Sequence, residues 1–151
     1  MIIDGKVLAE KIKAELKSEV LKLQKKIRLA VVKVGENPAS EKFLEQKKKF
    51  ADDIGVDVRI YEIPEDISTN KLREKVSEIV HIKENDGVII QLPLPAQINT
   101  QYILDAIISE KDPDMLSSKS WGKFTVGKSK ILPPVVGAIK EIFTAYGVEL
   151  K

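Results

Sequence analysis

Three short runs of aliphatic residues, at 29–34, 56–63 and 88–91, alternate along the chain with segments whose apolar residues recur at helical spacing. Gly35 closes the first run and Pro64 the second, while prolines follow soon after the third. Such runs are typical of buried strands, because Gly and Pro interrupt a strand. Strands that alternate with helices favour a parallel sheet, since each parallel connection needs a crossover. The sequence therefore predicts an α/β domain with three α-β-α layers and a mostly parallel sheet.

The helical segments are preceded by residues that can cap a helix. The predicted helices are 5–26 after Asp4, 38–54 after Asn37, one that follows Ser68 or Thr69, a short one after Asn99, and 135–146 after Pro133 and Pro134. Residues 110–130 are rich in Ser, Gly, Lys and Asp, and are predicted to form a loop or a ribbon of short irregular pieces. A loop of this length is suspected of a function.

Composition narrows the classes of function. The 151 residues favour one domain, and 25 basic and 23 acidic residues are interspersed, which argues against a nucleic-acid surface. Without cysteine there is no disulfide or thiolate chemistry. The one histidine, His81, is predicted to cap a helix C-terminus or to lie at the surface, so no metal is expected. Neither a signal peptide nor a membrane-spanning run is found, so a cytoplasmic protein is the default expectation.

The stretch 34–49 holds a strand end, a glycine turn, a capped helix start and three consecutive lysines. Ser40, Phe43 and Lys47 fall at i, i+3 and i+7, so they share a helix face, which we expect to line a substrate site with Lys47 at its centre. Most such lysine triplets are solvated charge runs. A lysine enclosed by the strand ends would instead lose hydration, which favours its neutral form and lets it act as a base.

Two further positions could carry chemistry. Gln91 leaves a buried strand directly into Leu-Pro-Leu-Pro, where its amide either satisfies loop backbone groups or faces a ligand. Asp112 and Asp114 bracket Pro113, and a turn is the ordinary interpretation of that pattern. A carboxylate held there can alternatively accept two parallel N–H bonds from a flat heterocycle.

Taken together, VGENPASEKFLEQKKKFADDIGV, DGVIIQLPLPAQIN and ISEKDPDMLSSKSWGKF resemble the substrate domain of the bifunctional methylenetetrahydrofolate dehydrogenase/methenyltetrahydrofolate cyclohydrolase family. The N-terminal MIIDGKVLAEKIKAEL is similar to that family's N-terminus, so the resemblance spans essentially the whole chain. It implies a role in folate one-carbon metabolism, with a tetrahydrofolate derivative as substrate.

The resemblance also implies residue roles. Lys47 matches the family's catalytic lysine, and Gln91 matches the glutamine of QLPLP, which contacts that lysine. Asp114 matches the aspartate that binds the pterin. Ser40 belongs to the PAS motif and is expected to be a substrate-binding residue. Phe43 stands where the family usually has a tyrosine. This replacement keeps the ring that can stack on the substrate and loses the hydroxyl.

Other departures from the family come late in the chain. Met115 replaces a glycine and Ser120 an asparagine, and the run proline-cysteine-threonine-proline becomes PPVV at 133–136. The family's second, dinucleotide-binding domain carries a glycine-rich phosphate turn, and this sequence has no GxGxxG motif. The expectation is one tetrahydrofolate-binding catalytic domain over 1–151, with NADP bound only if a second domain is supplied.

Two functions of different class remain open at this point. The chain is either a substrate domain that retains at most the cyclohydrolase reaction, or a non-catalytic folate-binding module or degenerate partner subunit. The expected partners are the folate substrate and, by family resemblance, a second copy in a homodimer, with no nucleic acid or membrane.

Overall fold

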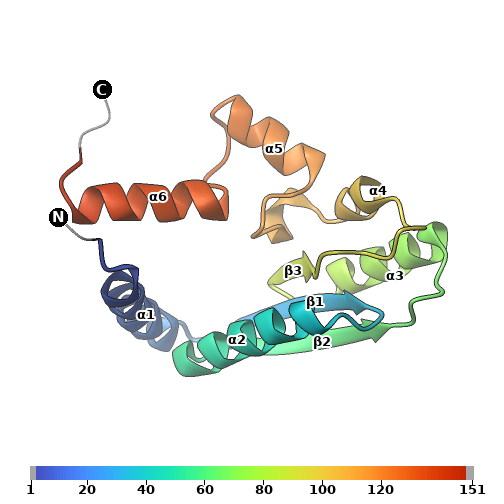
Figure 1. Ribbon diagram of the computed structural model, residues 1–151, viewed down its shortest axis with the longest axis horizontal. Helices are drawn as coiled ribbons and strands as arrows, with labels where there is room; N and C mark the ends of the chain where they lie inside the picture. The colour runs from blue at the N-terminus through green and yellow to red at the C-terminus, as the bar shows by residue number, and fades with distance from the viewer. Residues whose placement is uncertain (1–2, 149–151) are drawn as a thin grey trace.

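The computed structural model describes residues 3–148 (Figure 1). Its elements follow one another as three strands and seven helical segments. They are α1 (Gly5–Lys22), β1 (Arg28–Val34), α2 (Pro38–Ile54), β2 (Asp57–Ile63), α3 (Thr69–His81), β3 (Gly87–Ile90), α4 (Thr100–Leu104), the 3₁₀ helix η1 (Ser109–Lys111), α5 (Ser118–Thr125) and α6 (Pro134–Ala145). Within the described residues, no helix is both long and apolar enough to cross a bilayer.

The three strands form one parallel sheet in the order β2-β1-β3. β1 is central, pairing with β2 over its whole length and with β3 from Leu29 to Val32. Its residues Ala30, Val31 and Val32 are fully buried, which is the pattern of a parallel strand covered on both faces. The predicted three-layer α/β arrangement with a parallel sheet is confirmed.

Helices cover the two faces of the sheet, with α2 on one and α3 on the other (Figure 1). On the α2 face, Val31 and Ile89 pack with Leu44. The larger core lies on the opposite face, where α3 buries the four residues expected of its apolar stripe. These are Leu72, Val76, Ile79 and Val80. Both cores are built from the period-2 and period-3.6 patterns of the sequence.

Helix starts agree with the expected caps. Asp4 accepts hydrogen bonds from Lys6 N and Val7 N, Ser68 caps α3, and Asn99 caps α4. The Asn37 side chain accepts a hydrogen bond from Ser40 N at 3.1 Å, and the chain leaves α2 through Gly55 with φ +84°. These local bonds satisfy backbone groups that a helix end leaves unpaired.

Two predicted boundaries are wrong. The first helix ends at Lys22 rather than near Lys26, because α1 buries none of its residues and Leu23 turns into extended backbone that leads to β1. Residues 110–130 are not merely irregular, since they contain α5. Its cap is Ser117, whose hydroxyl accepts from Ser120 N and donates to the buried carboxylate of Asp112. No periodic pattern in the sequence marks these contacts.

The core on the α3 face can be tested with one substitution. Leu72→Ala removes a side chain with no exposed surface and should lower the free energy of unfolding by about 2–5 kcal/mol, through lost burial and the cavity left behind. Leu21→Ala, at a position 76% exposed, is the matched control and should change stability by about 0.5 kcal/mol or less. Urea denaturation measures both, and equal effects would contradict this packing.

Candidate active site along β3

Ser40 and Lys47 of α2 both reach the segment that follows β3. The Ser40 hydroxyl donates to the carbonyl of Leu92 at 3.1 Å, and Lys47 Nζ donates to Gln91 Oε1 at 3.4 Å. Seven residues span about 10 Å of helix, so the two contacts anchor α2 to this segment at separated points. Lys47 is half-buried, whereas Lys48 and Lys49 are exposed, so the three lysines of the run are not equivalent.

Gln91 is positioned by the sheet and by its own amide. Its backbone N–H donates to the carbonyl of Val32 at 2.9 Å, which continues the β1–β3 ladder past the end of β3. Its side-chain Nε2 donates to the carbonyl of Leu92 at 3.0 Å, so Oε1 is left to face Lys47. One end of the amide therefore serves the loop, as the first interpretation of this glutamine expects, and the other end meets the lysine.

Asp112 and Asp114 have different environments. Asp112 is buried and accepts from Leu116 N, Ser117 N and the Ser117 hydroxyl, at 3.3, 3.0 and 2.7 Å. It closes the turn that the Asp-Pro-Asp pattern suggests. Asp114 receives no hydrogen bond from any described residue. One aspartate is therefore structural, and the other has its acceptor capacity unused.

The electrostatics of Asp114 connect it with Lys47. Burial raises the pKa of the Asp114 carboxyl above its ordinary value, the nearby charge of Lys47 lowers it, and that of Asp112 raises it. A carboxyl group that has lost water and gained no donors is suited to a ligand that brings its own N–H groups. The sequence places these residues 67 positions apart, and the fold brings them into electrostatic contact.

Lys47, Gln91 and Asp114 thus lie along β3 rather than around the glycine turn after β1. Gln91 follows the end of the strand, while Pro113 packs at its start, where a Cβ built on Gly87 would be 3.6 Å from Pro113 Cγ. The side chain of Phe43 is 62% exposed and borders a hollow of about 470 Å³ with other residues of α2. Its ring is open to stacking.

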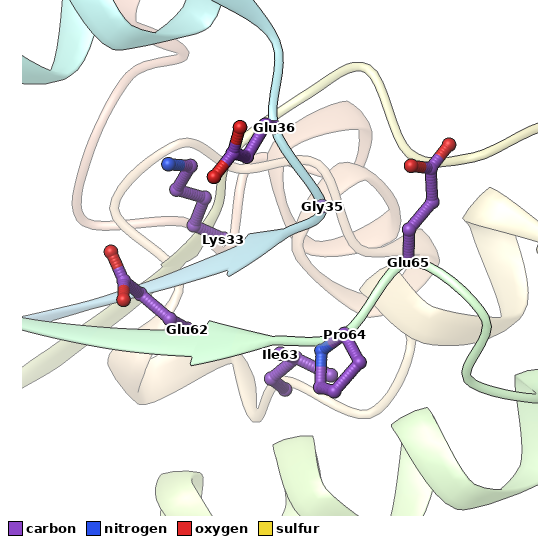
Figure 2. Close-up of a pocket in the computed structure, with 7 residues that line it drawn as sticks. All are labelled: Lys33, Gly35, Glu36, Glu62, Ile63, Pro64 and Glu65. Atoms are coloured by element: carbon purple, nitrogen blue, oxygen red, sulfur yellow. The ribbon is translucent and has the colours of Figure 1, made fainter.

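The hollow at the glycine turn is chemically different (Figure 2). It has a volume of about 480 Å³ and lies between the ends of β1 and β2. Lys33 lies on the same side of it as Glu36 and Glu62, and Glu65 lies on the far side. Lys33 pairs with Glu41 at 3.0 Å, and this bond raises the pKa of its ammonium group. None of the candidate catalytic residues lines this hollow, and no described group of carboxylates or histidines is arranged to hold a metal ion.

Known proteins resemble this chain in sequence and in structure. Residues 3–114 match the family described as tetrahydrofolate dehydrogenase/cyclohydrolase, catalytic domain. The chain belongs to the tetrahydrofolate dehydrogenase/cyclohydrolase family. Among curated members of this family, the bifunctional protein FolD of Geotalea uraniireducens is 38% identical over 152 residues, which cover 99% of this chain and 54% of the relative. FolD of Nitratiruptor is 34% identical over 154 residues and is covered to 55%.

Solved members of the family share the fold. The bifunctional FolD dehydrogenase/cyclohydrolase of Campylobacter jejuni superposes with a TM-score of 0.95 at 33% identity, covering 100% of this chain and 55% of that one. A Trypanosoma brucei FolD, solved with NADP cofactor and inhibitor, superposes with a TM-score of 0.89 at 27% identity, covering 99% and 52%. The chain spans about half the length of the curated relatives it matches.

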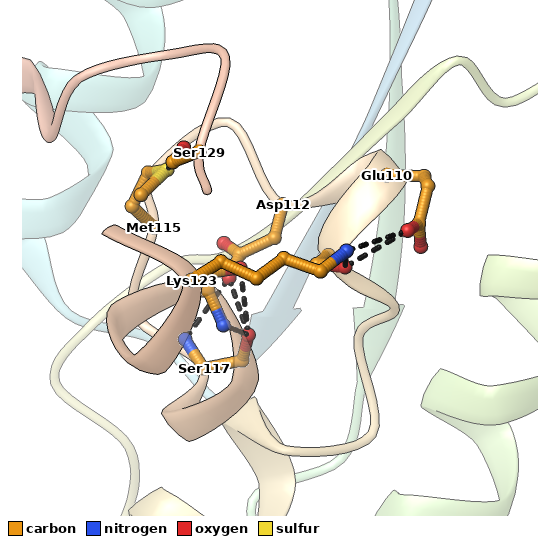
Figure 3. A network of polar contacts seen from close by, with 8 residues as sticks. Glu110, Asp112, Met115, Ser117, Lys123 and Ser129 are labelled. Atoms are coloured by element: carbon orange, nitrogen blue, oxygen red, sulfur yellow. Dashed lines mark hydrogen bonds and ion pairs between the residues drawn. The ribbon is translucent and has the colours of Figure 1, made fainter. Parts of the chain in front are cut away.

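Met115 gives a physical reason for the glycine that the resemblance places at this position in the family. It has φ +56°, in the left-handed region where a side chain is unfavourable, and it is nevertheless buried, with 2% of its surface exposed. Its sulfur lies 3.7 Å from the Ser129 hydroxyl (Figure 3). Sequence reasoning had no signal for this contact, because it joins the turn to a loop beyond α5.

A polar network also ties η1 to α5, and sequence reasoning did not find it (Figure 3). Lys123 Nζ donates to Glu110 Oε1 at 2.8 Å and to the Ser109 hydroxyl at 2.5 Å. The hydrogen bond from Lys123 lowers the pKa of Glu110 to about 2. Its carboxylate therefore stabilises the fold above the ordinary value of 4.5, and this contribution is lost as the pH falls from there toward 2.

This assignment predicts a titration. In the unaltered chain, carbon-13 NMR of the Glu110 carboxyl should give a midpoint near 2, and Lys123→Gln should raise it toward 4.5 because the donor is removed. Lys119→Gln removes a charge from the exposed side of the same helix and should leave the midpoint unchanged. A midpoint that does not respond to Lys123→Gln would show that the ion pair does not form in solution.

Proposed function

We propose that this chain is the substrate domain of a folate one-carbon enzyme and that it hydrolyses 5,10-methenyltetrahydrofolate along β3. The observation that carries the proposal is the contact between Lys47 Nζ and Gln91 Oε1, because it joins the two residues to which the resemblance gives catalytic roles. Family membership and the solved relative from Campylobacter jejuni, a methylenetetrahydrofolate dehydrogenase/cyclohydrolase, support the class of substrate. In this proposal the residues have distinct roles.

Lys47 acts as the general base. Water attacks the bridging carbon of the cationic amidinium, and one of its protons passes to Lys47 Nζ. The resulting carbinol loses its hydroxyl proton as one carbon–nitrogen bond breaks; the departing nitrogen keeps the electron pair of that bond and takes up a proton, which leaves an N-formyl group and an N–H. Gln91 Oε1 accepts a hydrogen bond from the lysine and so holds Nζ toward the substrate. The substrate already carries positive charge, so water can attack without further activation of the carbon.

Asp114 recognises the pterin and Phe43 the aminobenzoyl ring. The amino and ring N–H groups of a pterin are two parallel donors. They match the two oxygens of the Asp114 carboxylate, which receives no hydrogen bond from any described residue. Because burial raises the pKa of Asp114, folate binding should weaken as acidification protonates this carboxyl. Ser40 keeps the segment after β3 in place through the Leu92 carbonyl.

Nicotinamide chemistry belongs to a second domain in this proposal. The sequence has no GxGxxG turn, so residues 1–151 form the tetrahydrofolate-binding catalytic domain and NADP binds only when a dinucleotide-binding domain is supplied. A homodimer and a cytoplasmic location stay part of the proposal.

A second candidate function is a folate-binding module without catalysis, and Phe43 favours it. The family tyrosine that Phe43 replaces would offer a hydroxyl to the lysine, and a phenyl ring cannot. Such a module would bind 5,10-methenyltetrahydrofolate, observed by calorimetry or by Trp121 fluorescence, without the loss of absorbance that hydrolysis causes. Binding without turnover by the unaltered chain would favour this function over the first.

The neighbouring lysines provide a matched pair for the central test. Lys47→Ala should abolish the loss of methenyltetrahydrofolate absorbance, whereas Lys48→Ala should retain nearly all of it, because only the first lysine contacts Gln91. Both substitutions remove one positive charge from adjacent positions of the same helix. Equal rates for the two variants would contradict the assignment of Lys47.

A second substitution tests the lost hydroxyl. Phe43→Tyr keeps the ring at an exposed position and restores a donor on the face of α2 that carries Lys47. It should raise the hydrolysis rate by about tenfold, while folate affinity measured by calorimetry changes little, since stacking is unaltered. Phe50→Tyr, on the same helix at an exposed site, serves as control. A rate unchanged by Phe43→Tyr would exclude this role for the hydroxyl.

A further inference from the structure

The proposed folate site does not involve a third hollow, which is more enclosed than those beside Phe43 and at the glycine turn. It has a volume of about 400 Å³ and is formed by η1, Met115, residues of α5 and the loop 127–131. Neither Lys47, Gln91 nor Asp114 lines it. It falls within the Ser- and Lys-rich segment that the sequence singles out for its length and composition.

Positive charge dominates this hollow. Lys123, Lys128 and Lys130 line it together with one acid, Glu110. Glu110 is committed to Lys123 at 2.8 Å, whereas no ion pair joins Lys128 or Lys130 to an acid among residues 3–148. Three ammonium groups against one carboxylate leave an excess of two positive charges at one concave site, which suits a doubly charged anion.

The other polar groups are compatible with such a ligand. Hydroxyls of Ser109, Ser120 and Ser129 line the same hollow. Those of Ser109 and Ser129 already donate to Glu110 Oε1 and to the Ile131 carbonyl, whereas the Ser120 hydroxyl accepts from Ser117 and can donate its own proton to an anionic oxygen. The carbonyls at the end of α5 would repel an anion if they were free, but Lys128 N donates to Lys123 O at 2.7 Å and Gly127 N to Phe124 O at 3.0 Å. Gly127 takes φ +70°, which folds the lysine-bearing loop back toward the helix.

We propose that the hollow between η1, α5 and the loop 127–131 binds a phosphate group, either as free phosphate or as the phosphate of a small monoester. Lys128 and Lys130 supply the charges that no acid neutralises, and Lys123 exchanges part of its contact with Glu110 for the ligand. The volume exceeds that of one phosphate, so it leaves room for the organic part of a monoester. The proposal is independent of the folate site and of hydrolysis there.

Calorimetry of the full chain tests this site with inorganic phosphate and with ribose 5-phosphate as probes. Lys128→Gln and Lys130→Gln should each weaken saturable binding by about tenfold, the size of one charge-assisted contact. Lys119→Gln removes the same charge from an exposed position outside the hollow and should leave binding unchanged. Glu110→Gln should tighten binding, because Lys123 then has no competing carboxylate.

The outcomes separate clearly. Tighter binding of ribose 5-phosphate identifies a phosphate monoester as the ligand, and equal binding identifies the phosphate group itself. No saturable binding of either probe, or equal weakening by Lys119→Gln and Lys128→Gln, would overturn the proposal. Folate binding to the same variants should be unaltered, so failure of this site and failure of the folate site can be distinguished.

Discussion

The pairing of β1 with strands on both of its sides is the constraint on which the candidate site depends. The Val32 carbonyl of β1 accepts from the Gln91 backbone N–H, so the glutamine begins its turn at a position set by the sheet register. Burial of β1 on both faces prevents it from shifting by one residue, because a shift would move core side chains to the wrong face. Gln91 can therefore meet a lysine from α2 at a defined place.

Two carboxylates close together in sequence are separated in function by what surrounds them. Asp112 receives three hydrogen bonds and holds the turn, while Asp114 is desolvated beside the charge of Lys47 and lacks donors. A carboxyl in the second situation costs folding free energy that a ligand can recover. The turn is thus built so that one aspartate provides rigidity and its neighbour remains available for recognition.

The same turn connects the candidate site with the rest of the chain. Met115 follows Asp114 in a left-handed conformation, and its buried side chain reaches Ser129 beyond α5. A change at Ser129 that displaces Met115 can therefore reach Asp114 through one packed side chain. The proposed phosphate hollow is lined by Met115 and by residues of the loop 127–131, including Ser129, whereas Asp114 does not line it.

Patterns with short range predict much of this molecule. The buried face of α3, the alternation of strands with helices and the spacing of Ser40 and Lys47 follow from periodicity, because each depends on residues within a few turns. What periodicity cannot predict is set by contacts that belong to no repeating pattern. α5 depends on Ser117 held by Asp112, and α1 ends early because the following residues must reach β1. Equally, nothing near Asp112 and Asp114 in the sequence indicates which of them lacks donors.

The most direct measurement of the central claim is a crystal structure of this chain with a stable, non-hydrolysable folate bound. We expect the pterin to bind to the carboxylate of Asp114, the one-carbon bridge to lie next to Lys47 Nζ and the aminobenzoyl ring to stack over Phe43. A folate bound in the acidic hollow at Gly35, or at any position away from Lys47, would contradict it.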